Sequence, residues 1–250
     1  MNARSLVVRG MLVGVVAGLL AFGFGWLFGE GPIDAAIAFE STHADPGVHE
    51  PELVGRTVQA TLGLGVAALV YGVALGGLFA LAFGFVYGRL SQLGARATSA
   101  ALAAIGLVTV FVVPFLKYPA NPPAVGNEAT IGRRSAWYVL MILISVAAAI
   151  GSTLVGRAMR QRLGTWNAAL VSVATYLVIV GAASALLPTV NEVPADFSAV
   201  LLWRFRMASL GTQLVLWTVV GLLFGALSER AELLRTNNVR AVAEQPARVE

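Results

Sequence analysis

The chain has 250 residues, of which 58% are hydrophobic and only 12% are charged, and it contains no cysteine. A soluble domain carries roughly a quarter charged residues, so this composition argues against a soluble enzyme or a soluble binding module. The lack of cysteine excludes disulfides and thiolate ligands, which leaves imidazole, carboxylate, amide and backbone oxygen for any metal site.

Six long apolar runs alternate with polar segments along the chain. Each run is close to or above the length of about 20 residues that crosses a bilayer core. The runs cover residues 6–28, 60–87, 99–116, 135–156, 167–187 and 208–228. We therefore predict an all-α, polytopic membrane protein with about six transmembrane helices. It would form one transmembrane domain over residues 1–230, followed by a short cytoplasmic tail over 231–250 that we expect to be disordered.

The charges sort themselves between alternate segments. The N-terminal tail, the second and fourth gaps and the C-terminal tail together carry a net charge of +7, whereas the first, third and fifth gaps carry −3. Basic loops of helical membrane proteins stay in the cytoplasm. This pattern predicts that both termini are cytoplasmic and that the acidic loops face outside. The basic pI then reflects membrane topology, and we expect no nucleic-acid partner.

Small residues recur every four positions in the first two runs. Gly10, Gly14 and Gly18 lie in the first run, and Gly72 and Gly76 lie in the second. This spacing lets helix backbones approach closely in lipid, so it predicts tight helix packing. A pathway lined by glycine is the alternative interpretation.

The first outer loop contains both histidines of the chain. His43 and His49 are six residues apart, with Glu40 before them and Glu50 directly after. Imidazole with carboxylate oxygens is a plausible ligand set for cobalt, nickel or zinc, so we predict a metal site at these four residues. The spacing matches no known metal motif, and a hydrated acidic loop is the alternative.

The other two outer loops differ in character. Three prolines stiffen the second loop, over 117–126, which predicts a lid or a rigid turn. In the third loop, Glu192 and Asp196 are four residues apart, and Arg204 and Arg206 follow. We predict that the two carboxylates bind one cation and that the arginines pair with them in a closed state. The alternative is that these four residues only anchor the loop to the membrane surface.

Motifs of catalysis and energy coupling are missing. No Asp, Glu, Lys or His lies in the middle of a span, and no nucleotide-binding loop, zinc-protease motif or serine-hydrolase motif is present. We therefore expect neither enzymatic activity nor a bound cofactor.

Several segments resemble one known family. They are residues 32–40, 56–59, 117–126 and 191–206. Over residues 1–230 the chain is similar to the CbtA family, the predicted membrane subunit of a cobalt transporter. The resemblance implies uptake of cobalt(II) linked to cobalamin synthesis, in the inner membrane of a bacterium. It also implies CbtB as a partner, a small subunit with one span and a histidine-rich end. Two histidines in the first loop are few for a dedicated cobalt site, which favours a metal site supplied by the partner.

Two functions follow from these observations. The leading one is a membrane subunit that takes up cobalt or another divalent metal cation, with the lipid bilayer, the cation and a CbtB-like subunit as partners. The alternative is a membrane scaffold that assembles another complex without transporting. Either is compatible with homo- or hetero-oligomers, and an intramembrane enzyme is disfavoured because no catalytic constellation is visible.

Overall fold

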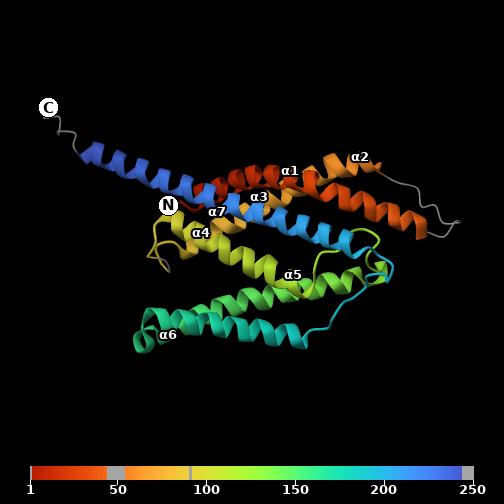
Figure 1. Cartoon of the computed structure of the whole chain (residues 1–250). Helices are drawn as coiled ribbons and strands as arrows, with labels where there is room; N and C mark the ends of the chain where they lie inside the picture. Colours follow the sequence, from red (N-terminus) through yellow and green to blue (C-terminus); the bar gives the residue numbers. More distant parts are fainter. Residues whose placement is uncertain (1, 44–53, 90–91, 244–250) are drawn as a thin grey trace. The chain divides into compact units, whose positions relative to one another are not determined.

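The computed structural model describes residues 2–43, 54–89 and 92–243, and within these ranges it consists of helices and connecting loops without strands (Figure 1). The prediction of an all-α protein is thus confirmed. In chain order the elements are α1 (Ala3–His43), α2 (Arg56–Val58), the π-helical turn η1 (Gln59–Gly63), α3 (Leu64–Val86), α4 (Ala95–Gly106), the π-helical stretch η2 (Leu107–Val112), α5 (Val113–Lys117), the 3-10 turn η3 (Glu128–Thr130), α6 (Ile131–Leu186) and α7 (Ala199–Ala243).

Five helices of the described chain are long and apolar enough to cross a membrane. The fourth of them, α6, reverses direction at Gly164, whose φ of 76° and ψ of 170° are not helical. Glycine adopts positive φ without steric cost, so it suits a tight reversal. Counting the two arms of α6 separately gives six apolar helical segments, in agreement with about six predicted spans.

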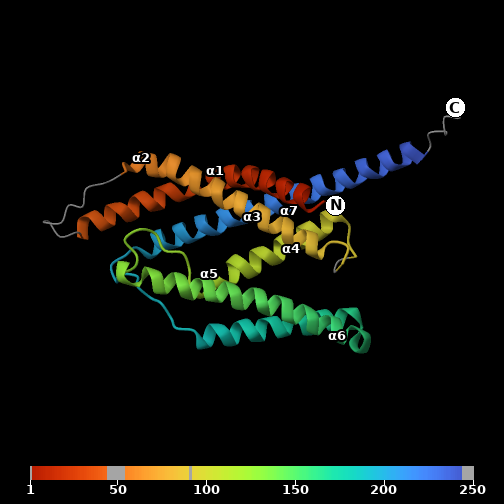
Figure 2. The ribbon, with the colours of Figure 1, turned by 180° about the vertical axis from the view of Figure 1, so that it is seen from behind.

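The two arms of α6 pack against each other in an antiparallel hairpin (Figures 1 and 2). The hydroxyls of Ser145 and Tyr176 are 2.8 Å apart, and the Ser172 hydroxyl donates to the Ser152 carbonyl oxygen at 2.8 Å. Nearer to the turn, a Cβ added to Gly156 would lie 2.9 Å from the Ser172 side chain. Small and hydroxyl side chains therefore hold the arms together, as is usual between helices in lipid.

The chain divides into two compact units. The first comprises residues 1–23, 54–105 and 214–250, and the second comprises 24–53 and 106–213. α1 and α7 each contribute one part to both units.

The first unit contains the predicted glycine seam between α1 and α3. Cβ atoms added to Gly10 or Gly14 would fall closer than 3.0 Å to the carbonyl oxygens of Gly76 or Gly72, and the reverse substitutions meet the same obstacle. The two backbones are thus in direct contact, so these glycines act in helix packing. The seam leaves no room for a pathway between them.

Aromatic rings and a buried hydroxyl join α3, α4 and α7 in the same unit. Phe224 is fully buried, and its ring makes edge-to-face contacts with Phe79 at 5.4 Å and Phe83 at 5.1 Å between centroids. The buried Ser99 hydroxyl of α4 donates to the Gly221 carbonyl oxygen of α7 at 2.7 Å. Close approach and satisfied polar groups make this unit a packed helical bundle.

The second unit places two long loops, 118–130 and 187–198, beside the ends of helices. Ala36 of α1, Val125 of the first loop and Phe197 of the second form a buried apolar cluster. A larger cluster centres on Val113 and Met141, at the base of the first loop. These contacts fix both loops to the helical scaffold.

Some helix ends differ from the expected positions. We expected a loop after residue 28, but α1 continues to His43 with Pro32 inside it. The continuation is stabilised because Ala36 is completely buried and the ring of Phe39 stacks edge-on against Phe197. α7 begins at Ala199, so Arg204 and Arg206 are helical, and it continues to Ala243, well beyond residue 230 where we expected a disordered tail to begin.

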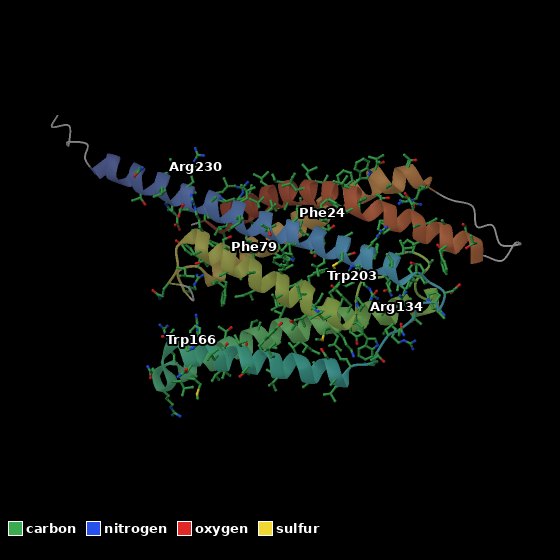
Figure 3. All side chains as sticks on the ribbon, viewed as in Figure 1. Phe24, Phe79, Arg134, Trp166, Trp203 and Arg230 are labelled. Atoms are coloured by element: carbon green, nitrogen blue, oxygen red, sulfur yellow. The ribbon has the colours of Figure 1, made fainter. Side chains whose placement is uncertain are left out.

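Large apolar side chains cover the outward faces of the helices. Leu177 and Val178 on α6, for example, are 61% and 70% exposed. Trp166 lies at the turn of α6, and Trp203 lies near the start of α7 (Figure 3). Exposed apolar faces bounded by tryptophans are typical of a protein surrounded by lipid. The chain is thus a multi-pass membrane protein.

Candidate functional site

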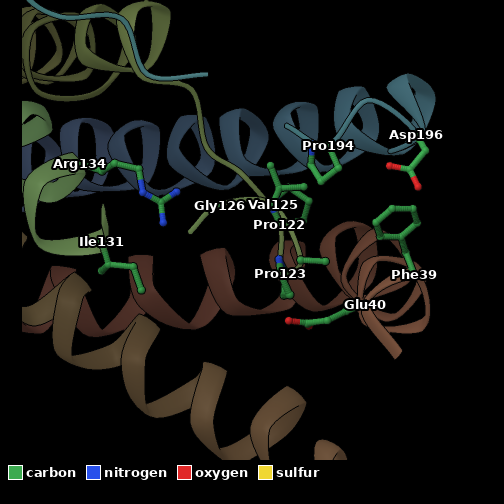
Figure 4. A pocket seen from close by; sticks show the side chains of 11 residues that line it. Phe39, Glu40, Pro122, Pro123, Val125, Gly126, Ile131, Arg134, Pro194 and Asp196 are labelled. Atoms are coloured by element: carbon green, nitrogen blue, oxygen red, sulfur yellow. The ribbon is translucent and has the colours of Figure 1, made fainter. Parts of the chain in front are cut away.

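A cavity of about 550 Å³ lies within the second unit, which we call the acidic cavity (Figure 4). Its lining comes from the end of α1, both loops and the start of α6. The lining residues are Phe39, Glu40, Pro122, Pro123, Ala124, Val125, Gly126, Ile131, Arg134, Pro194 and Asp196. Two of the predicted metal ligands, Glu40 and Asp196, therefore lie in one cavity although they are distant in sequence.

Local structure explains how these two carboxylates reach the same cavity. Glu40 is carried there by the extension of α1, the part of the helix that we expected to be a loop. Asp196 lies in a turn closed by a hydrogen bond from the Phe197 N–H to the Pro194 carbonyl oxygen at 3.1 Å. The contact between Phe39 and Phe197, with ring centroids 5.0 Å apart, joins the two segments.

Arg134 of α6 contributes the positive charge of the acidic cavity. Figure 4 shows Arg134 on one side of the cavity and Glu40 and Asp196 on the other. The Arg134 guanidinium packs against Gly126, where a Cβ would clash with it, and it donates to the Asn127 carbonyl oxygen at 3.4 Å. With two carboxylates and one guanidinium, the cavity lining carries a net negative charge, which favours a cation.

Glu192 serves a different purpose from Asp196. Its carboxylate accepts hydrogen bonds from the Asn127 N–H at 2.8 Å and the Thr130 hydroxyl at 2.7 Å, and it lies 3.4 Å from Nε of Arg134. These donors, the Asn127 N–H above all, hold the pKa of the Glu192 carboxyl below its ordinary value. The carboxylate thus ties the 187–198 loop to the 118–130 loop and to the start of α6.

Among the described residues, Glu192 does not pair with the arginines of α7 as predicted. Glu192 is paired with Arg134, and Arg206 instead donates to the Ala120 carbonyl oxygen at 3.2 Å and to Oδ1 of Asn121 at 3.1 Å. Arg204 is exposed. For Glu192 the expectation was wrong: α7 begins at Ala199, so Arg206 is part of a helix and reaches the proline-rich loop.

A second cavity, of about 720 Å³, also lies within this unit, and we call it the arginine cavity. It shares Arg134 with the acidic cavity and adds Arg206 and Glu192. Its remaining lining is largely aromatic and aliphatic. That part consists of Phe111, Phe115, Tyr118, Pro119, Ala120, Asn121, Pro122, Pro123, Val125, Ile131, Ser135, Tyr138, Val139, Val190, Asn191 and Val193.

The predicted site residues thus separate into groups. Glu40 and Asp196 line the acidic cavity, whereas Glu192 lines the arginine cavity. His43 is the last residue of α1, and His49 and Glu50 lie outside the described residues. Among the described residues, no three His, Asp or Glu side chains gather closely enough to hold a metal ion.

Arg134 is a charged residue of both cavity linings that the sequence did not single out. The arginine pair 133–134 follows the proline-rich loop at the start of a span. That position is equally typical of an interfacial anchor, so only its contacts with Gly126, Asn127 and Glu192 reveal its place between two cavities.

Fold and site together define a multi-pass helical membrane protein with polar cavities among its loops. Over residues 3–229 the chain matches the family described as probable cobalt transporter subunit (CbtA), and it belongs to that family. No curated protein and no solved structure matches the chain. The family places the protein among the subunits of metal transporters, and the resemblance noted in the sequence is confirmed.

Proposed function

We propose that this chain is the membrane subunit of a transporter that takes up cobalt(II) across the inner membrane of a bacterium and supplies cobalamin synthesis. The observation that carries the proposal is that Glu40 and Asp196 line the same acidic cavity. Two carboxylates near the mouth of a membrane protein raise the local concentration of divalent cations, although salt screens this attraction beyond about 8–10 Å.

The ligand set of the entry site would be completed from neighbouring segments. Two carboxylates alone suit hard cations, whereas imidazole favours cobalt over magnesium or calcium. His43 ends the same helix that carries Glu40, and His49 with Glu50 follows shortly after in the sequence. We propose that these residues, or a histidine-rich CbtB-like subunit, supply the imidazole ligands.

Uptake of radiolabelled cobalt by cells tests the proposal. At limiting cobalt, Asp196→Asn should lower the initial uptake rate about fivefold, which is the effect of the ~1 kcal/mol that one charge contributes near water. Asp34→Asn is the matched control, because Asp34 is an exposed aspartate of α1 that does not line the acidic cavity. Uptake that is equal with and without the chain would contradict transport and favour the scaffold function.

The histidines should affect the affinity of capture. Replacing both His43 and His49 with alanine should raise the cobalt concentration for half-maximal uptake without lowering expression. Imidazole must be neutral to bind a metal, and its ordinary pKa is about 6.5, so uptake by the unmodified protein should weaken below about pH 6. Unchanged uptake by the double variant at limiting cobalt would remove both histidines from the site.

The entry site requires the acidic loops to face outside, with both termini in the cytoplasm. The reversal of α6 at Gly164 supports this topology because it returns the chain to the side from which α6 started. Reporter fusions near residues 45, 125 and 195 should be external, and fusions near 93, 161 and 240 should be internal. A reporter at residue 250 found outside would contradict the scheme.

A further inference from the structure

The arginine cavity has the size and lining of a site for a small organic molecule. Its volume of about 720 Å³ lies within the usual range of 300–1,000 Å³ for ligand sites. The rings of Phe111, Phe115, Tyr118 and Tyr138 supply an apolar wall. Such a lining binds the body of a ligand by apolar contact and leaves orientation to a few polar groups.

The charged groups of this cavity favour an anion. Arg134 and Arg206 contribute two positive charges, and among the described lining residues Glu192 contributes the only negative charge. The Glu192 carboxylate is already engaged by Asn127, Thr130 and Arg134. Within the part of the chain that the structure describes, Arg206 donates only to neutral oxygen atoms. A divalent cation would therefore be repelled here, in contrast to the acidic cavity.

Arg206 retains the donors that a carboxylate requires. A guanidinium has five N–H donors, and the bonds to Ala120 and Asn121 use two of them. The same two bonds hold the side chain in place, so little further ordering is needed when a ligand binds. Nε of Arg134 in the same lining is buried and lies 3.4 Å from the Glu192 carboxylate, an ion pair without hydrogen-bond geometry, so Arg206 is the main donor for a ligand.

We propose that the arginine cavity binds a small organic carboxylate with an apolar body. The guanidinium of Arg206 receives the carboxylate through paired N–H···O bonds, the arrangement that gives arginine its preference for this group. The aromatic wall receives the apolar body. This site adjoins the proposed cobalt entry, with which it shares Arg134, but the two cavities carry opposite net charge and so favour different ligands.

Titration of the purified, detergent-solubilised full chain with benzoate, in metal-free buffer, tests the proposal. Benzoate should bind by calorimetry, and benzamide, its neutral isostere, should bind at least about tenfold more weakly because the charge-assisted bonds are lost. Equal binding of benzoate and benzamide would overturn the proposal. The metal-free buffer keeps this outcome independent of cobalt transport.

A pair of neighbouring arginines provides matched variants. Arg206→Gln should weaken benzoate binding about tenfold or more, whereas Arg204→Gln should leave it within about twofold, because Arg204 lies two residues away on α7 and lines neither cavity. Arg206→Lys keeps the positive charge but loses the paired N–H donors of the guanidinium, so this variant should bind benzoate with intermediate affinity. Equal benzoate affinity in the unmodified protein and in either variant of Arg206 would contradict the assignment.

Discussion

The α1–α3 seam of the first unit and the cavity loops of the second unit both depend on residues without long side chains, but for opposite reasons. In the seam, Gly14 and Gly72 remove side chains so that two backbones touch. In the loops, prolines 119, 122 and 123 stiffen a segment that encloses open space of several hundred Å³. The seam encloses no cavity that could bind a ligand. The loops enclose cavities and make few apolar contacts beyond those that hold them in place.

Stability and function are therefore expected to respond to different substitutions. Changes in the seam should affect folding and insertion of the whole chain. Changes around the cavities should affect ligand capture and the local order of the loops, with smaller effects on the global unfolding transition.

The largest expected effect is that of Gly14→Ala. The new Cβ would fall closer than 3.0 Å to the backbone of Gly72, so α1 and α3 must separate, at a cost of about 1–3 kcal/mol. The measurement is thermal unfolding of the protein in detergent. Gly23→Ala on the same helix is the control, because a Cβ there meets nothing within 4 Å and should be neutral or stabilise by up to about 1 kcal/mol. Equal melting temperatures of the two variants would show that the seam is not closely packed.

A smaller and pH-dependent effect is expected for Glu192→Gln. The native carboxyl has a lowered pKa, so its stabilising contribution is fully present above the unfolded value of about 4.3 and is lost as the pH falls through the lower folded value. The variant should melt at a lower temperature than the unmodified protein at pH 7, and the difference should shrink as the pH falls below about 4. The check is the melting temperature of both proteins between pH 3 and pH 7.

The effect of Glu192→Gln on cobalt uptake can be compared with the effect of Asp196→Asn. Asp196 lies in the acidic cavity, whereas Glu192 ties loops together, so the variant of Glu192 should change stability more than it changes cobalt uptake. The opposite result, loss of uptake with unchanged melting, would return Glu192 to the metal site that the sequence suggested.

The sequence predicted the spans well because each depends on a local property. Twenty apolar residues identify a helix in lipid without knowledge of its neighbours, and the four-residue spacing of Gly10, Gly14 and Gly18 places all three on one face. The turn at Gly164 lies in the gap between the fourth and fifth apolar runs, where the sequence predicted a loop. These features require no contacts between distant residues.

The cavity was only partly predictable because its geometry depends on tertiary contacts. The first apolar run ends at residue 28, but the burial of Ala36 and the ring of Phe39 extend α1 to His43 and carry Glu40 into the cavity. The partner of Glu192 was misidentified because Arg206 is closer in sequence and Arg134 is closer in space. The residue types of an acidic loop suggest that a site is present. Which of several arginines pairs with Glu192 depends on the tertiary fold.

The smallest effects are expected from ion pairs, and the two units offer a direct contrast. Arg96 Nε and Glu229 Oε2 of the first unit are 2.6 Å apart, but the two side chains are 67% and 36% exposed. Arg134 Nε and Glu192 Oε2 of the second unit are 3.4 Å apart, yet these side chains are only 24% and 21% exposed, and Glu192 accepts two further hydrogen bonds. Distance alone would rank the first pair as the stronger.

Double-mutant cycles should reverse that ranking. Water and salt screen the exposed pair, so the coupling between Arg96→Gln and Glu229→Gln should be about 0–1 kcal/mol and should vanish in high salt. The coupling between Arg134→Gln and Glu192→Gln should be larger and should persist in salt, because removing either partner also disturbs the bonds to Asn127 and Thr130. Unfolding of the four single and two double variants is measured at low and high salt. The result shows whether the N···O distance or the solvent exposure of the pair determines the coupling energy. A larger coupling for the Arg96 pair would mean that the loops around the cavities are held by their prolines rather than by Glu192.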